Sequence, residues 1–177
     1  MLRSFEAGLS LGDRITTCAI HVDEGAYTGQ WRMRGTGLVW HGQGVLRYVD
    51  WPFDRATYTG RFEDGSMTHG TMLYDRPGGS KSYSGDFVDG QAGGYGTMEE
   101  DGLRYEGQFQ GGQPHGLGTL TLPNGDYCEG QFADGMASGV ARQVVRSAGS
   151  FTYSGGFRSG SRHGHCIARY ADGSMCV

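Results

Sequence analysis

The chain is 177 residues long and 34 of them are glycine, without the every-third-residue spacing and high proline content of a collagen-like chain. Its 8 Phe, 10 Tyr and 3 Trp are too many aromatic residues for a disordered chain, so we expect it to fold. A net charge of -4 gives no long-range attraction for phosphate groups, which argues against nucleic acid as a partner and disfavours a membrane surface.

Two features of the composition predict a cytoplasmic protein. The four cysteines are too few and too widely spaced for a disulfide framework, and the only asparagine, Asn124, is not part of a glycosylation sequon. No apolar run approaches the roughly 18 residues that would cross a bilayer. The first residues also lack the apolar stretch of a signal peptide, so we expect no cleaved leader.

A unit of about 23 residues repeats along the chain. Residues 1–26 fit the unit loosely and are predicted to form a degenerate leading hairpin or N-terminal cap. Residues 27–177 hold six copies, of which the clearest reads Tyr105-Glu-Gly107-Gln-Phe109, followed by His115-Gly116-Leu-Gly118. The six copies start at Tyr27, Tyr58, Tyr83, Tyr105, Cys128 and Tyr153.

The first five positions of each copy alternate in character. Because side chains on a strand point to alternate faces, the Tyr, Gly and Phe or Trp at positions 1, 3 and 5 share one face, and polar residues occupy the other. The central Gly leaves a shallow slot that a neighbouring ring can cover. A later Gly, such as Gly112, permits a tight hairpin turn. The pattern predicts an all-β fold: an elongated, twisted antiparallel meander of tandem β-hairpins, forming an open single-layer sheet with little helix.

This pattern closely resembles the MORN (membrane occupation and recognition nexus) motif, Tyr-x-Gly-x-Trp/Phe-x-x-Gly-x-x-His-Gly-x-Gly. The resemblance implies a curved sheet with an aromatic groove, and a non-enzymatic scaffold that holds a helix or an extended segment of another protein. It further implies membership of a larger cytoskeletal assembly of a cilium or flagellum, such as the radial spokes of an axoneme. The groove predicted in this way consists of Tyr27, Trp31, Tyr58, Phe62, Tyr83, Phe87, Tyr105, Phe109, Phe132, Tyr153 and Phe157.

The resemblance leaves two alternatives open, a phospholipid or membrane-junction binding module and a regulatory subunit of a separate enzyme. An enzyme is not expected from the residues themselves. The histidines that recur beside glycine fill one slot of the repeat, and two copies carry glycine or serine there instead, so we predict no catalytic residue and no cofactor. These histidines are His41, His69, His115 and His163.

The best candidate for a metal site is the cluster of His163, His165, Cys166 and Cys176, because imidazole and thiolate are plausible zinc ligands. Against zinc, Cys166 points to the strand face opposite the histidines. Cys176 and Cys128 both stand in the Tyr slot of the repeat, where cysteine serves as a small apolar substitute. We therefore predict no metal site.

Two departures from the repeat distinguish this array. The first copy carries an expansion that adds Trp40, Trp51 and Phe53, which we interpret either as loop anchors for a partner or as a cap that folds back on the end of the sheet. The sheet edge after the sixth copy lacks proline and a lysine cluster. Such an edge invites strand pairing with a second copy of the chain or with another protein.

Overall fold

The computed structural model describes residues 5–6, 16–22, 25–50, 54–76, 78–147 and 149–177. Within these residues the chain forms antiparallel strands joined by tight turns and contains no helix, as the sequence predicts. It therefore also has, within them, no helix of the length and apolar character that a membrane crossing requires. The chain divides into two compact units, unit 1 (Met1–Gln91) and unit 2 (Ala92–Val177).

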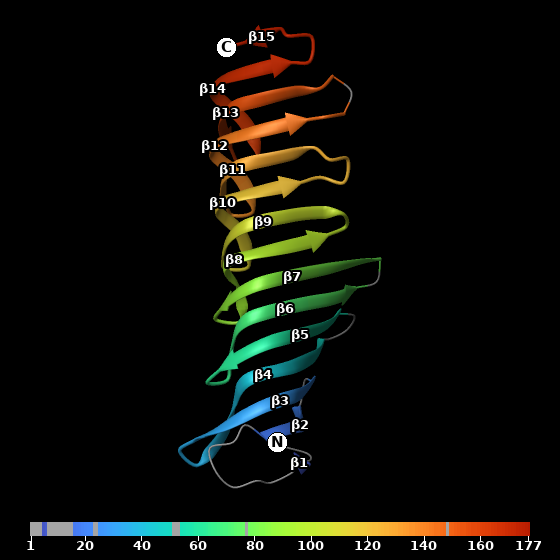
Figure 1. The fold of residues 1–177 in the computed structure, drawn as a ribbon, viewed down its shortest axis with the longest axis vertical. Coiled ribbons are helices and arrows are strands. Elements are labelled where there is room, and N and C mark those ends of the chain that lie inside the picture. Colours follow the sequence, from blue (N-terminus) through green and yellow to red (C-terminus); the bar gives the residue numbers. More distant parts are fainter. Residues whose placement is uncertain (1–4, 7–15, 23–24, 51–53, 77, 148) are drawn as a thin grey trace. The chain divides into compact units, whose positions relative to one another are not determined.

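In unit 1 each strand pairs antiparallel with the next strand along the chain (Figure 1). The first two strands lie in the segment predicted as a leading hairpin or cap, of which residues 1–4, 7–15 and 23–24 lie outside the described residues. The strands are β1 (Phe5–Glu6), β2 (Thr16–Val22), β3 (Gly25–Arg34), β4 (Gly37–Asp50), β5 (Asp54–Glu63), β6 (Ser66–Arg76) and β7 (Gly79–Val88).

Unit 2 has the same arrangement of consecutive antiparallel strands (Figure 1). Its first strand begins at the last residue of unit 1. The strands are β8 (Gln91–Glu100), β9 (Leu103–Gln110), β10 (Gln113–Thr121), β11 (Tyr127–Ala133), β12 (Met136–Val145), β13 (Phe151–Arg158), β14 (Ser161–Tyr170) and β15 (Met175–Cys176).

The hairpin turns need residues with positive φ, as the spaced glycines predict. Between β5 and β6 the two turn residues, Asp64 and Gly65, have φ of 50° and 87°, the combination of a type I′ turn that matches the twist of the strands. The same glycine also joins neighbouring copies, because its N–H donates to the carbonyl oxygen of Trp40 at 2.8 Å. Equivalent bonds in unit 2 join Gly112 to Ala92, Gly135 to Pro114 and Gly160 to Ala137.

The core of each unit is a ladder of aromatic rings on one face of the sheet, which we call the ring face. Within a copy, the first-position Tyr meets the fifth-position ring edge to face, as Tyr58 meets Phe62 at 5.0 Å between centroids. The same Tyr also meets the fifth-position ring of the next copy, as Tyr58 meets Phe87 at 5.0 Å. Edge-to-face pairs at this distance are favourable beyond their buried area. The ladder thus supplies the contacts between copies that a single hairpin lacks.

Candidate interaction surface

All eleven rings of the predicted groove lie on the ring face, and each exposes at most 6% of its surface. Their area is therefore used for packing between copies. A role of these eleven rings in binding a partner remains a prediction. Half-buried side chains lie beside them, on the return strands or directly after one: Tyr48 and Tyr74 in unit 1, and Leu120 and Leu122 in unit 2.

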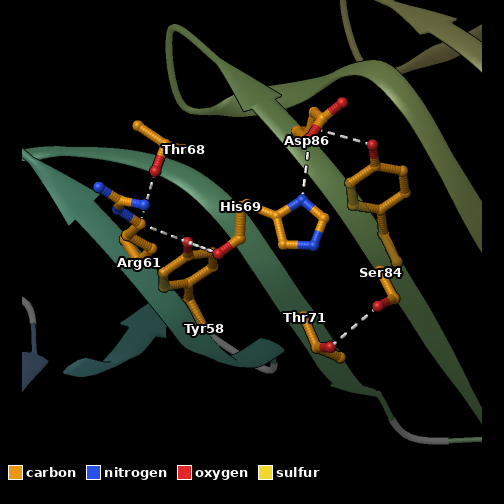
Figure 2. Close-up of polar contacts among 8 residues, drawn as sticks. Tyr58, Arg61, Thr68, His69, Thr71, Ser84 and Asp86 are labelled. Carbon is orange, nitrogen blue, oxygen red and sulfur yellow. Dashed lines mark hydrogen bonds and ion pairs between the residues drawn. The ribbon is translucent and has the colours of Figure 1, made fainter. Parts of the chain in front are cut away.

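In three copies the first-position tyrosine, Tyr27, Tyr58 or Tyr105, lies over two glycines of its own copy. A Cβ on Gly60 would come within 2.6 Å of the Tyr58 hydroxyl, and one on Gly70 within 2.9 Å of its Cζ. The hydroxyl lies 2.8 Å from the carbonyl oxygen of Arg61 and 2.9 Å from that of His69, in donating geometry to both (Figure 2). Burial raises the pKa of Tyr58 to about 12. The predicted slot over glycine is thus filled by the tyrosine of the same copy.

The expansion in the first copy lengthens the β3–β4 hairpin. Trp40 lies within β4 opposite Trp31 and stacks on Tyr27, with ring centroids 4.9 Å apart and planes at 12°. Trp40 therefore lies on a strand and not on a loop, and its position opposite a core ring turns the indole onto the ring face. As an anchor for a partner it stays a prediction. The indole packs on the sheet against Tyr27 and Phe62. The other two predicted anchors, Trp51 and Phe53, lie outside the described residues.

The histidines of the repeat lie at the start of the return strands and differ in their surroundings. The main-chain carbonyl oxygens of His69 and His115 accept hydrogen bonds from the hydroxyls of Tyr58 and Tyr105. This contact of the repeat position uses the main chain and does not depend on the imidazole. The exposed side chain of His69 reaches Asp86 on the next strand, with 2.8 Å between Nδ1 and Oδ1 (Figure 2). Beside this pair the Thr71 hydroxyl donates to the Ser84 hydroxyl at 3.1 Å.

The structure does not bring the four candidate zinc ligands together into one cluster. All four residues are described, and within the described part of the chain no three or more His, Cys, Asp or Glu side chains are placed to hold a metal ion. Cys166 lies opposite Gly155 on the neighbouring strand, Cys176 lies opposite Ala168, and His163 and His165 are exposed.

Sequence reasoning missed a role for the glutamine at the fourth position of three copies. The Gln108 Oε1 accepts the main-chain N–H of Leu117 at 2.7 Å, and the Gln131 Oε1 accepts that of Val140 at 2.8 Å. The Gln30 Oε1 does the same for Gln43. Each glutamine thus holds the bend after the His-Gly pair, where a Cβ on the glycine would overlap the amide. The recurring Tyr-x-Gly-Gln-Phe/Trp sequence was the available signal.

The face opposite the rings, which we call the outer face, carries exposed apolar side chains in unit 2. Tyr95, Leu117 and Val140 follow the bend in three successive copies and expose 63%, 60% and 71% of their surface. The equivalent residues in unit 1, Gln43 and His69, are polar. The two units therefore differ on the outer face although their ring faces are built alike.

A family model described as MORN repeat matches residues 39–52, 83–103, 105–127, 128–143 and 153–175, more than half of the chain. The matched segments begin at the first position of the third, fourth, fifth and sixth copies and include most of β4 in the first copy. No curated protein sequence gives a significant match. The family's repeat is a non-enzymatic module, consistent with binding to a protein or a membrane.

Proposed function

This chain belongs to the MORN repeat family, and we propose that it is a non-enzymatic scaffold that binds another protein. One observation carries the proposal. The ring face already provides a continuous core, yet Tyr95, Leu117 and Val140 remain exposed on the other face of the same sheet. Exposed apolar side chains gathered on one surface are typical of interaction sites.

The proposed partner is a subunit of a larger assembly, cytoskeletal or axonemal as the family resemblance implies. On the ring face, a partner would cover the half-buried side chains beside the ladder, such as Tyr74 and Leu122, rather than the rings themselves. The net charge of -4 favours this role over the binding of anionic lipid. Strand pairing at the free sheet edge, with another protein or a second copy of the chain, is a further way in which such a scaffold could assemble.

The proposal is tested by affinity capture with the full chain under gentle extraction, followed by mass spectrometry. Two surface variants probe the two faces: Tyr74→Ser with Leu122→Ser on the ring face, and Leu117→Glu with Val140→Glu on the outer face. The control is Val88→Glu, because Val88 is similarly exposed, at 59%, and belongs to neither of the two altered pairs.

We expect a stoichiometric protein partner that the control retains and at least one surface variant loses, with all proteins melting at similar temperatures by circular dichroism. Capture that neither surface variant changes would contradict a scaffold that binds through its faces. Co-flotation of the chain with anionic liposomes at physiological salt, without a protein partner, would favour the lipid-binding alternative instead.

A further inference from the structure

Five strands of unit 2 each contribute one side chain to a line across the outer face, which we call the outer row. Tyr95 on β8 lies opposite Gln108 on β9, and Leu117 on β10 lies opposite Gln131 on β11. Main-chain bonds to the glutamine amides connect Gln108 to Leu117 and Gln131 to Val140 on β12. The outer row therefore alternates apolar side chains and amides and contains no charged group.

The apolar members of the outer row stand on alternate strands, so the strand spacing sets their separation at about 9.6 Å. A polyproline II segment presents the same face every three residues, about 9.3 Å apart. Positions seven apart on a helix are separated by about 10.5 Å, and an extended strand returns to one face every 6.6 to 6.8 Å or so. The spacing fits polyproline II best and an extended strand least.

The glutamine amides of the outer row also favour a polyproline II segment as the ligand. The Oε1 atoms of Gln108 and Gln131 are occupied by main-chain N–H groups, which fixes both amides in place. Among the described residues neither amide nitrogen makes a hydrogen bond, so two donors per side chain remain. A helix satisfies its own carbonyls, whereas a polyproline II backbone has no internal hydrogen bonds and needs external donors. Fixed amide donors that lie between apolar side chains therefore suit a polyproline II segment better than a helix.

The absence of charge on the outer row also favours such a segment. Proline and apolar residues can cover Leu117 and Val140 without removing an ion from water, which would be costly. A polyproline II segment is already extended before it binds, so less conformational entropy is lost on a flat surface. Unit 1 lacks this combination, because Gln43 and His69 replace the apolar residues and Arg61 replaces one of the glutamines.

We propose that the outer row binds a proline-rich segment of a partner protein in the polyproline II conformation, with apolar residues at every third position. The inference rests on the proposed scaffold function and names its partner class. Tyr95, Leu117 and Val140 contact the apolar positions, and the amide nitrogens of Gln108 and Gln131 donate to the carbonyls between them.

The test measures fluorescence anisotropy of a labelled peptide of three Leu-Pro-Pro units titrated with the full chain. One matched probe has the same composition with its leucines adjacent, and another is an alanine-based helix with leucine at every seventh position. We expect saturable binding of the Leu-Pro-Pro probe, at least tenfold tighter than that of either matched probe. Equal or tighter binding of a matched probe, or no saturable binding of the Leu-Pro-Pro probe, overturns the proposal.

Variants place the binding on the outer row. Leu117→Glu and Val140→Glu should each weaken binding at least tenfold, and Val88→Glu should leave it unchanged. Gln131→Glu keeps the acceptor for the Val140 N–H but removes both amide donors, so it should weaken binding at least threefold. Binding that Leu117→Glu and Val140→Glu do not change overturns the proposal. The Leu-Pro-Pro probe could show no binding while affinity capture still yields a protein that a surface variant loses. That result would overturn the polyproline II proposal and leave the scaffold function standing.

Discussion

The fourth and fifth copies are neighbours in unit 2 and differ at the first position of the repeat, which is Tyr105 in one and Cys128 in the other. Tyr105 is fully buried, and its hydroxyl donates to the carbonyl oxygens of Gln108 at 3.1 Å and His115 at 3.4 Å. Burial raises its pKa to about 12. Cys128 is half-buried and has no ring, and burial raises the pKa of its thiol. The fifth copy thus lacks both the ring and its hydrogen bonds.

The return strands of these two copies differ in a matching way. In the fourth copy a Cβ on Gly118 would lie 2.7 Å from Cε2 of Tyr105 and closer still to its Cζ and hydroxyl. In the fifth copy the same position holds Ala141, which is buried with 4% exposure and lies opposite Gly130. Gly118 has no positive φ, so its backbone alone does not require glycine. The comparison teaches that in the fourth copy the ring leaves no room for a Cβ at this position, and that an alanine fits in the fifth copy, where the ring is missing.

The largest expected effect comes from removing the ring that distinguishes the two copies. Tyr105→Ala should lower the free energy of unfolding by about 3 to 5 kcal/mol, because it leaves a cavity and removes contacts with both Phe109 and Phe132. Cys128→Ala, the matched change in the fifth copy, should cost about 1 kcal/mol. Urea unfolding followed by circular dichroism measures both. Similar losses in the two copies would show that the ring is not the main contact between them.

A smaller effect is expected from adding one methyl group beneath the ring. Gly118→Ala should cost about 1 to 3 kcal/mol, because the new Cβ overlaps a buried side chain that cannot move away freely. In a Tyr105→Cys background the same substitution should cost almost nothing, since that pair recreates the fifth copy. A double-mutant cycle by urea unfolding gives the coupling between the two positions.

The reverse exchange serves as the control for this cycle. Cys128→Tyr alone should destabilise the fifth copy, and Ala141→Gly should relieve that loss when both are present. Additive effects in the two cycles would mean that the ring and the glycine are independent, contrary to the comparison.

The hairpins and the ring face could be predicted from the sequence because both depend on short spacings. Alternation along one strand places Tyr58 and Phe62 on the same face, and the glycine at the turn fixes where the chain reverses. Each of these features lies within about ten residues of its neighbour in the repeat. Six copies of the pattern also make an accidental match improbable.

Contacts across strands were harder to predict because they depend on the register. The hydrogen bond from the Val140 N–H to the Gln131 side chain arises only after the bend at the His-Gly slot shifts the pairing of β11 and β12. Trp40 was misplaced for a similar reason, because its position opposite Trp31 follows from how far the β3–β4 hairpin extends. The apolar side chains of the outer row are visible in the sequence, but their alignment across β8 to β12 requires the paired strands.

The fifth copy differs from the fourth in a second respect, the polar contact at its start. The buried Asp126, immediately before β11, accepts the N–H of Arg146 at 2.7 Å and the N–H and hydroxyl of Ser147 at 3.3 and 3.2 Å. The amide of Asn124 donates to the same carboxylate at 3.0 Å. These bonds connect the beginning of the fifth hairpin to the residues that follow the hairpin. In the fourth copy the polar contacts of the first strand come instead from the Tyr105 hydroxyl.

The smallest effect is therefore expected from Asp126→Asn, and it should depend on pH. The N–H of Arg146 is the main cause that lowers the pKa of the Asp126 carboxyl in the folded chain, with further contributions from Asn124 and Ser147. A carboxyl whose pKa is lowered by folding stabilises the fold above its unfolded pKa, and this stabilisation is lost as the pH falls through the folded value. The stability difference between wild type and Asp126→Asn should accordingly be largest near neutral pH and shrink below about pH 4. Urea unfolding at several pH values measures it, with Glu129→Gln as the control because that exposed side chain makes no hydrogen bond or ion pair with another described residue. A difference that stays constant with pH would mean that the shape of the Asp126 side chain, and not its charge, holds the start of the fifth copy.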